Sequence, residues 1–365
     1  LEACVKREAI KLGFENIHTF DGRVEFTGDE SVIPKANLWF RCASRILIKI
    51  GTFKAVSFEE LFQGTKALPW EEWIPVDGKF TVVGKSVKST LYSVSDCQAI
   101  VKKAVVERLK GVYDVDWFDE TGAEYTIQVA LLKDIVTLTI DTSGSSLHKR
   151  GYRANALDAP LKETLAAAMI ELSYWNKDRV LMDPFCGSGT LVIEAAQKAL
   201  NLAPGLRRRF AAEHFDFVPA DIWAEQRQKA LDEVRKDAAF EGIGYDIDPA
   251  AVALANANAK LAGVGDRCRF EVADVREFRA LDNATVLTNP PYGERLGDAS
   301  EAASLARTLG QVWQAHPAQG LYAITADAEF EQHFGKKAAR RRKIYNGMIP
   351  CQLYMYFEQP KRERK

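Results

Sequence analysis

The chain has 365 residues, of which 47% are hydrophobic and 27% are charged, as expected for a globular protein of two or three domains. It lacks an apolar run of membrane-spanning length, a signal-peptide pattern and any C-x-x-C pair among its six cysteines, so we expect a cytoplasmic protein with reduced thiols and no metal site. The formal net charge of −1 excludes a uniformly basic nucleic-acid-binding protein, and any such site must be a local patch.

The first 150 residues alternate short helices with short strands. Helical periodicity is found at residues 4–14, 32–43, 56–68 and 93–111, and strand patterns at residues 23–28, 45–53, 79–87 and 125–144, the last being two strands joined at Lys133–Asp134. The chain enters directly into a helix, which suggests that a leading strand is missing. The pattern predicts two α+β units, residues 1–55 and 56–150, with helices packed against antiparallel sheets.

From residue 155 to residue 365, apolar strands alternate with long helices. Strands are predicted at residues 179–184, 242–248, 268–274, 284–290 and 320–326, followed by a terminal pair at 342–347 and 351–359. Helices are predicted between them, at residues 159–175, 190–200, 248–263 and 303–316. The alternation is typical of an α/β fold with a doubly wound sheet. Residues 201–236 interrupt it and are interpreted as an inserted helical excursion.

A glycine loop follows the first strand of this second half, in the sequence LMDPFCGSGT at residues 181–190. The strand ends at Asp183, and Gly187 and Gly189 allow a tight turn before a helix begins at Thr190. Ligands of such sheets bind outside the carboxyl ends of the strands. The third glycine of a dinucleotide fingerprint is replaced by Val192, and no G-K-[ST] follows, so neither a pyrophosphate nor a P-loop site is favoured.

Acidic residues end three successive strands, at Asp183, Asp246 and Asp274. Each of them taken alone is more often a helix N-cap. Because all three would lie at the same edge of the sheet, together they indicate a ligand that offers an amino group, a ribose and an adenine. In dinucleotide-binding folds the acidic residue that binds the ribose follows the glycine loop by roughly 20 residues. Asp246 lies much farther along the chain, and the excursion at residues 201–236 accounts for the difference. A ligand with these parts is S-adenosylmethionine.

The sequence VLTNPPYGERL, residues 286–296, ends the fourth strand. Its simplest interpretation is a strand followed by a turn. With a methyl donor nearby, the Asn289 side-chain oxygen and the Pro290 carbonyl are candidate acceptors for both hydrogens of an exocyclic base amine. Pro290 and Pro291 lack an N–H and fix the backbone, and Tyr292 is a candidate platform for a base extracted from its stack.

Three local basic patches stand out, HKRGYR at residues 148–153, LRRRF at 206–210 and KKAARRRK at 336–343. Each of them alone is more often a solvated face. In HKRGYR, the residues Lys149, Arg150 and Arg153 lie at the junction of the two halves, where they can reach either an RNA phosphate or the cofactor pocket. A salt-bridged linker is the alternative interpretation of the same residues.

Five segments of the chain carry a resemblance to a known family: DPFCGSGT, GYDIDP and NPPYGERL, with HKRGYR and APLKETLAAAMI upstream. Together they resemble the RlmL-type guanine-N2 methyltransferases of large-subunit rRNA, which carry an N-terminal THUMP region. The resemblance covers nearly the whole chain. It implies a ferredoxin-like part at residues 1–55, an RNA-binding THUMP domain at 56–150 and a class I Rossmann-like methyltransferase domain at 155–365. It further implies that S-adenosylmethionine is bound by Asp183, Pro184, Phe185, Gly187, Gly189, Thr190, Asp246, Ile247, Asp274, Val275 and Asn289.

The same resemblance places the base site at Asn289, Pro290, Pro291 and Tyr292, and implies 23S rRNA as the partner. Two other activities remain open, because N-P-P-Y is shared with adenine-N6 methyltransferases that act on DNA or RNA, and a tRNA guanine is a further substrate. A third possibility is a non-catalytic RNA-binding or assembly factor. A DNA enzyme needs a module that reads the major groove, and the sequence offers no helix-turn-helix, which favours the RNA substrate.

Overall fold

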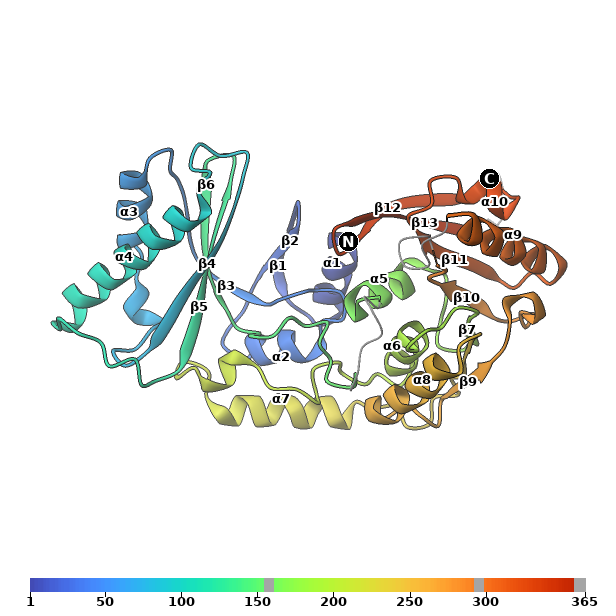
Figure 1. The fold of residues 1–365 in the computed structure, drawn as a ribbon. Coiled ribbons are helices and arrows are strands. Elements are labelled where there is room, and N and C mark those ends of the chain that lie inside the picture. Colours follow the sequence, from blue (N-terminus) through green and yellow to red (C-terminus); the bar gives the residue numbers. More distant parts are fainter. Residues whose placement is uncertain (154–160, 292–298, 358–365) are drawn as a thin grey trace, which may run out of the picture.

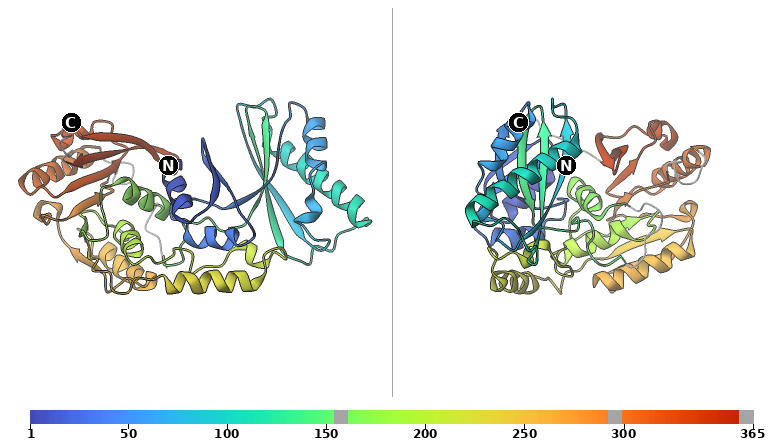
Figure 2. Two further views of the ribbon diagram at one scale, coloured as in Figure 1. Left: turned by 180° about the vertical axis from the view of Figure 1, so that it is seen from behind. Right: turned by 60° about the vertical axis from the view of Figure 1, so that its left-hand side comes forward.

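The computed structural model describes residues 1–153, 161–291 and 299–357 of the chain (Figure 1). The described part forms an open U in which a four-stranded sheet with two helices stands at one end and a seven-stranded sheet at the other. The N-terminal elements lie between them, and α7 (Ala220–Asp232) runs along the base, as the left view in Figure 2 also shows. Among the described helices, none has the length and apolar character needed to cross a bilayer.

The first unit contains α1 (Glu2–Lys11), a hairpin of β1 (Glu15–Phe20) and β2 (Arg23–Thr27), and α2 (Val32–Trp39). The predicted helices and β2 are confirmed, whereas β1 was not predicted from the sequence. Its side chains are nearly all exposed, so the alternation of buried and exposed residues that marks a half-buried strand is absent. Phe14, Phe26 and Phe40 pack together and close this small core.

The four-stranded sheet has the order β3-β6-β5-β4, with β3 (Leu47–Lys54), β4 (Lys79–Val87), β5 (Glu124–Leu132) and β6 (Ile135–Asp141). Lys133 and Asp134, both with positive φ, form the tight turn between β5 and β6, as predicted. The prediction of antiparallel sheets is wrong for one pair, because β4 and β5 are parallel. The long helix α4 (Val94–Tyr113) makes the crossover between them and packs on one face of the sheet with α3 (Phe58–Lys66).

The seven-stranded sheet has the order β12-β13-β11-β10-β7-β8-β9. Its central strands are β7 (Leu181–Asp183), β8 (Gly242–Asp246), β9 (Cys268–Val272), β10 (Thr285–Thr288) and β11 (Gly320–Thr325), all parallel to one another. The terminal pair, β12 (Arg340–Asn346) and β13 (Ile349–Phe357), is antiparallel and completes the sheet beside β11. The doubly wound sheet with a terminal strand pair is therefore confirmed.

Helices cover both faces of this sheet, as a parallel sheet requires. One hydrophobic core contains residues of α5 (Glu163–Leu172), α6 (Thr190–Ala199) and α8 (Pro249–Ala262). The core on the opposite face contains residues of α9 (Ala299–Ala315) and α10 (Phe330–Phe334), next to the 3-10 helix η3 (Val275–Glu277).

The excursion at residues 201–236 contains the 3-10 helix η2 (Ala211–His214) and α7. Its aromatic side chains belong to the core of the N-terminal half, where Phe215 stacks on Tyr125 of β5 with 4.3 Å between ring centroids. Trp223 stacks on Phe210, and its indole nitrogen donates to the Ala212 carbonyl. The excursion thus leaves the methyltransferase-like sheet and completes the hydrophobic core of the other half.

Candidate active site

The candidate site lies at one edge of the seven-stranded sheet. Because β10, β7, β8 and β9 are adjacent and parallel, their carboxyl ends meet at the same edge, where ligands of such sheets bind. Asp183 ends β7, Asp246 ends β8 and Asn289 directly follows β10. Asp274 lies two residues beyond β9 and caps η3. The structure therefore brings together the four strand-end residues that the sequence singled out.

The glycine loop between β7 and α6 needs both of its glycines. Gly187 and Gly189 have positive φ values of 50° and 82°, in the region that favours glycine. A side chain at Gly189 would come within 2.8 Å of the Phe270 ring, whereas a side chain at Gly187 would meet no atom within 4 Å. The loop is thus packed against the protein at Gly189 and open at Gly187. The Gly187 amide donates to the Asp246 carboxylate at 2.9 Å.

Asp183 is a buried carboxylic acid at the end of β7, with 2% of its surface exposed. One carboxyl oxygen accepts from the Thr288 hydroxyl at 2.7 Å and from the Phe185 amide at 3.1 Å. Burial raises the pKa of Asp183 to about 7, and these two hydrogen bonds oppose the increase. Thr288 was missed in the sequence, although it immediately precedes the predicted Asn289. Pro184 is buried in the same loop.

Asp246 and Asp274 have different surroundings. The two oxygens of Asp246 accept from the amides of Gly187 and Asp248, and the next residue, Ile247, has 67% of its surface exposed. Both oxygens of Asp274 accept from the Arg276 guanidinium, and these hydrogen bonds lower its pKa to about 2. The pairing of Asp274 with Arg276 was not predicted. Val275, by contrast, is buried.

Asn289 follows β10 and has an unusual polar environment. Its side-chain oxygen is buried and accepts no hydrogen bond within the described part of the chain. Such an unpaired acceptor costs free energy in a folded protein unless a ligand completes it. Pro290 is buried and Pro291 is half-buried, and neither has an amide hydrogen to pair with that oxygen. The predicted platform Tyr292 lies outside the described residues.

The HKRGYR segment requires a correction. Arg150 has 3% of its surface exposed, and its guanidinium lies 3.4 Å from the Glu194 carboxylate and donates to the carbonyls of Leu147 and Arg41. The Tyr152 hydroxyl also donates to Glu194. The interpretation of Arg150 as an RNA contact is therefore wrong, because its donors are used inside the protein. The alternative of a salt-bridged linker applies to this residue.

Arg153 and Lys149 differ from Arg150. The Arg153 guanidinium donates to the Thr190 hydroxyl at 2.7 Å and lies 3.4 Å from the Glu163 carboxylate. It therefore contacts the helix that follows the glycine loop. This position favours a role for Arg153 at the cofactor pocket over a contact with an RNA phosphate. Lys149 is exposed, so an RNA contact remains a prediction for it.

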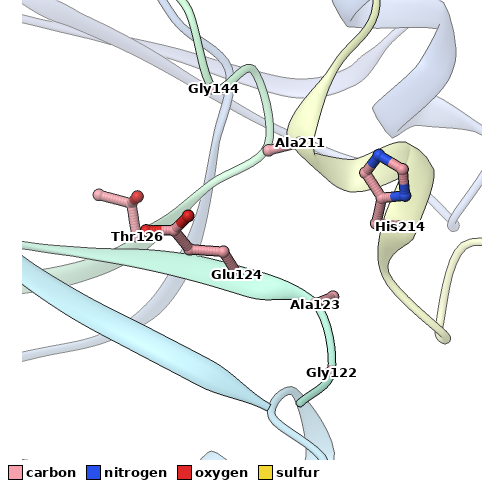
Figure 3. A pocket seen from close by; sticks show the side chains of 7 residues that line it. All are labelled: Gly122, Ala123, Glu124, Thr126, Gly144, Ala211 and His214. Carbon is pink, nitrogen blue, oxygen red and sulfur yellow. The ribbon is translucent and has the colours of Figure 1, made fainter. Parts of the chain in front are cut away.

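A separate cavity of about 660 Å³ lies away from this sheet edge (Figure 3). Glu124 and Thr126 of β5 line one side, and His214 of η2 lies opposite them. Its other lining residues are Gly122, Ala123, Gly144 and Ala211. None of the residues predicted to bind cofactor or base takes part, so this cavity is distinct from the candidate active site.

Three family models match consecutive parts of the chain. The model described as "RMKL-like, methyltransferase domain" matches residues 150–355, the THUMP domain matches residues 55–141, and the "RlmL ferredoxin-like domain" matches residues 1–47. A Bacillus subtilis protein named "Putative RNA methyltransferase YpsC" is 44% identical over 100% of this chain and 95% of its own length. The "Ribosomal RNA large subunit methyltransferase K/L" of Psychromonas ingrahamii is 35% identical over 97% of this chain, which spans 48% of that protein.

Solved structures also resemble this chain over nearly its whole length. A Listeria monocytogenes protein described as a "predicted N6-adenine-specific DNA methylase" is 47% identical, with a TM-score of 0.92 over 98% of this chain and 94% of that one. The protein SMU.472, described as "a putative methyltransferase complexed with SAH", is 40% identical, with a TM-score of 0.92 over 98% of this chain and 96% of that one. THUMP and RlmL-type ferredoxin-like domains precede the methyltransferase domain. Because the family model matches residues 150–355 and the relatives are similar over nearly the whole chain, the chain belongs to the RMKL-like methyltransferase family.

Proposed function

We propose that this chain is an RNA methyltransferase that transfers a methyl group from S-adenosylmethionine to the exocyclic N2 of a guanosine in 23S rRNA, in the cytoplasm. The observation that carries the proposal is the buried, unpaired side-chain oxygen of Asn289 at the sheet edge that also holds the glycine loop. The names of the Bacillus subtilis and Psychromonas ingrahamii relatives support RNA, and ribosomal RNA in particular, as the substrate.

The residues present fit the proposed cofactor. The open side of the backbone at Gly187 leaves room beside the loop, and the buried carboxyl of Asp183 suits the cationic amino end. Asp246 lies at the position for ribose hydroxyls, and exposed Ile247 offers an apolar surface to an adenine. Asp274 and Val275 stand at the adjoining strand end. The bound cofactor would supply a methyl group activated by a sulfonium. SMU.472, 40% identical, holds the demethylated product of this cofactor.

The role of Asn289 follows from the chemistry of the acceptor. The nitrogen of a nucleobase amine is a weak nucleophile because its lone pair is delocalised into the ring. Accepting the two amine hydrogens at the Asn289 side-chain oxygen and the Pro290 carbonyl favours the pyramidal nitrogen that attacks a methyl group. A preorganised acceptor in a buried site is more effective than water, because it needs no reorganisation during the reaction. The N–CH3 bond would form as the S–CH3 bond breaks, and the proton that the methylated amine then loses would pass to solvent water, because the Asn289 amide is too weak a base to keep it.

Methylation of adenine N6 in DNA is the second candidate, favoured by the likeness to the Listeria monocytogenes structure described in those terms. Guanine N2 in a tRNA is the third. The deciding experiment incubates the protein with labelled S-adenosylmethionine and unmodified 23S rRNA, tRNA or DNA, followed by nucleoside mass spectrometry. We expect N2-methylguanosine in the 23S rRNA. N6-methyladenine in DNA would overturn the proposal, and N2-methylguanosine only in tRNA would correct the substrate.

Cofactor binding is expected to depend on pH through Asp183. Since its pKa is raised to about 7, the carboxyl is protonated below that pH and must ionise to pair with an ammonium group. Binding therefore releases a proton, and affinity should rise by up to about tenfold per pH unit between roughly pH 5 and 7. Above pH 7 the affinity should level off, because the Asp183 carboxyl is then ionised in the free protein as well. Calorimetric titration with S-adenosylhomocysteine measures this profile.

Two variants test the assignment of this pH dependence. In Asp183→Asn the increase between pH 5 and 7 should vanish and binding should weaken, because no carboxyl ionises there. The matched control is Asp274→Asn, whose carboxyl has a pKa of about 2 and stays ionised throughout this range. It should bind more weakly at every pH with an unchanged profile. A rise in affinity retained by Asp183→Asn would assign the titration to another group.

A further inference from the structure

The strand β12 is an edge of the seven-stranded sheet and is strongly basic. Its first four residues, Arg340, Arg341, Arg342 and Lys343, are all exposed. Arg341 lies 3.5 Å from the Glu331 carboxylate, and the other three form no ion pair with any carboxylate in the described ranges. These residues make up half of the KKAARRRK patch at residues 336–343, which the proposed function leaves without a role.

Edge strands often carry charges that prevent pairing with other chains. The strand at the opposite edge of the same sheet, β9, shows the charges of an edge strand for comparison. On β9, Arg269 lies 3.4 Å from Glu271 of the same strand and 3.9 Å from Glu241. Positive and negative charges are therefore balanced on β9. On β12 the cations have no acid within the strand, and the excess positive charge calls for another explanation.

The strand register ties this basic strand to the candidate active site. Thr288 pairs with Ala323, Ala323 with Tyr354, and Tyr354 with Arg341. The row after Thr288, in which Asn289 stands, continues through Ile324 and Leu353 to Arg342. Three strand spacings of about 4.8 Å separate Asn289 from that strand, or roughly 14 Å. The basic strand thus lies at the same level of the sheet as the base site, with β11 and β13 between them.

The β12–β13 hairpin also projects past the sheet edge that holds the site. The last residue of β11, Thr325, pairs with Gln352, and the hairpin continues through three more residue pairs, or about 10 Å. Its projecting part exposes Tyr345 to 55% and Met348 to 94%. The Lys343 ammonium lies 5.6 Å from the centre of the Tyr345 ring. A cation beside an exposed aromatic ring is the combination that binds single-stranded nucleic acid.

We propose that the β12–β13 hairpin binds the single-stranded RNA that flanks the target nucleotide, with Lys343 contacting a phosphate and Tyr345 stacking on a flanking base at one face of β12. Arg340 and Arg342, which alternate with them along the strand, contact phosphates from the other face across the open sheet edge. The inference rests on the proposed function for the nature of the substrate. The hairpin orients the strand so that the target base enters at Asn289, because an enzyme that modifies a base acts on a single strand or on a base turned out of its stack.

The test measures binding of a short fluorescein-labelled single-stranded RNA of mixed sequence at several salt concentrations. The variant is Arg342→Gln with Lys343→Gln, and the control of equal charge is Lys236→Gln with Arg269→Gln, two exposed residues remote from the hairpin. Losing two phosphate contacts should reduce the slope of log affinity against log salt by about 1.4 and weaken binding roughly tenfold at low salt. The control should bind as the parent does.

A second pair of variants tests the aromatic contact. Tyr345→Ala should weaken RNA binding by about tenfold, within the range known for base stacking on an aromatic ring, whereas Tyr345→Phe keeps the ring and should bind as the parent. Salt dependence should be unchanged in both variants, because no phosphate contact is lost. An equal loss with Tyr345→Phe would contradict stacking.

These measurements separate the inference from the proposed function. If the hairpin variant binds RNA with the parent's affinity and salt slope while the parent methylates RNA, the inference is wrong and the function stands. If RNA binding falls as expected but the parent transfers no methyl group, the function fails and the binding surface stands. If only binding of duplex DNA is weakened, the hairpin serves a DNA substrate and the inference is overturned.

Discussion

Replacing Asn289 with leucine is expected to slow methyl transfer by roughly 100- to 1000-fold, the range found when one preorganised polar group is removed from a transition state. Leucine has nearly the shape of asparagine, so the buried position after β10 stays filled and only the unpaired oxygen is lost. The loss should appear in kcat, because the acceptor acts on the amine as it becomes pyramidal. Single-turnover assays with excess enzyme and labelled cofactor measure it.

The matched variant Asn289→Asp keeps an acceptor oxygen at the same place and should retain substantially more activity than Asn289→Leu. Cofactor binding, measured by calorimetry, should weaken far less than methyl transfer in the leucine variant, since Asp183, Asp246 and the glycine loop, which make up most of the proposed cofactor site, are unchanged. A leucine variant that methylates as fast as the parent would show that the Asn289 oxygen takes no part in the reaction. Loss of cofactor binding in both variants would instead place Asn289 in the cofactor pocket.

Replacing Arg150 with methionine is expected to destabilise the protein by about 3–5 kcal/mol, the cost of breaking a buried ion pair by removing one partner. Glu194 would remain buried, with the Tyr152 hydroxyl as its one remaining hydrogen-bond donor among the described residues. The carbonyls of Leu147 and Arg41 would each lose a donor. The free energy of unfolding, measured by urea denaturation of the full chain, tests this expectation.

Lys149→Met is the control for this prediction. Lys149 is exposed and adjacent in sequence, so the same change there should alter the free energy of unfolding by less than about 0.5 kcal/mol. A double variant, Arg150→Met with Glu194→Met, should recover part of the lost stability, because it removes the uncompensated charge. A single Arg150→Met variant as stable as the parent would show that the buried ion pair contributes nothing to stability.

The sequence was sufficient to predict most of the elements and the strand-end residues, because both depend on local patterns. Asp183, Asp246 and Asn289 each end a short apolar run, and a parallel sheet brings such ends to one edge whatever the details of packing. The glycine loop was predictable for a similar reason, since the φ of 82° at Gly189 suits glycine better than any other residue.

Features that depend on contacts between distant segments were not predictable. The parallel pairing of β4 with β5 depends on the crossover made by α4, and the alternation of residues along each strand is the same in either direction. The burial of Arg150 depends on Glu194, 44 residues away, and its sequence context resembles a basic patch. The sequence shows that Asp274 and Arg276 are only two residues apart, but it does not show that both oxygens of the carboxylate accept hydrogen bonds from the guanidinium.

The route of residues 201–236 has a consequence for synthesis of the chain. The core beneath the four-stranded sheet includes Tyr125 of β5, yet the ring stacked on it, Phe215, and the nearby Trp223 follow only after the first strand and helix of the catalytic sheet. At translation rates of about 5–20 residues per second, an emerging N-terminal half waits several seconds for them. The nascent N-terminal half therefore exposes apolar surface until the ribosome has delivered part of the methyltransferase domain, so the two halves mature together.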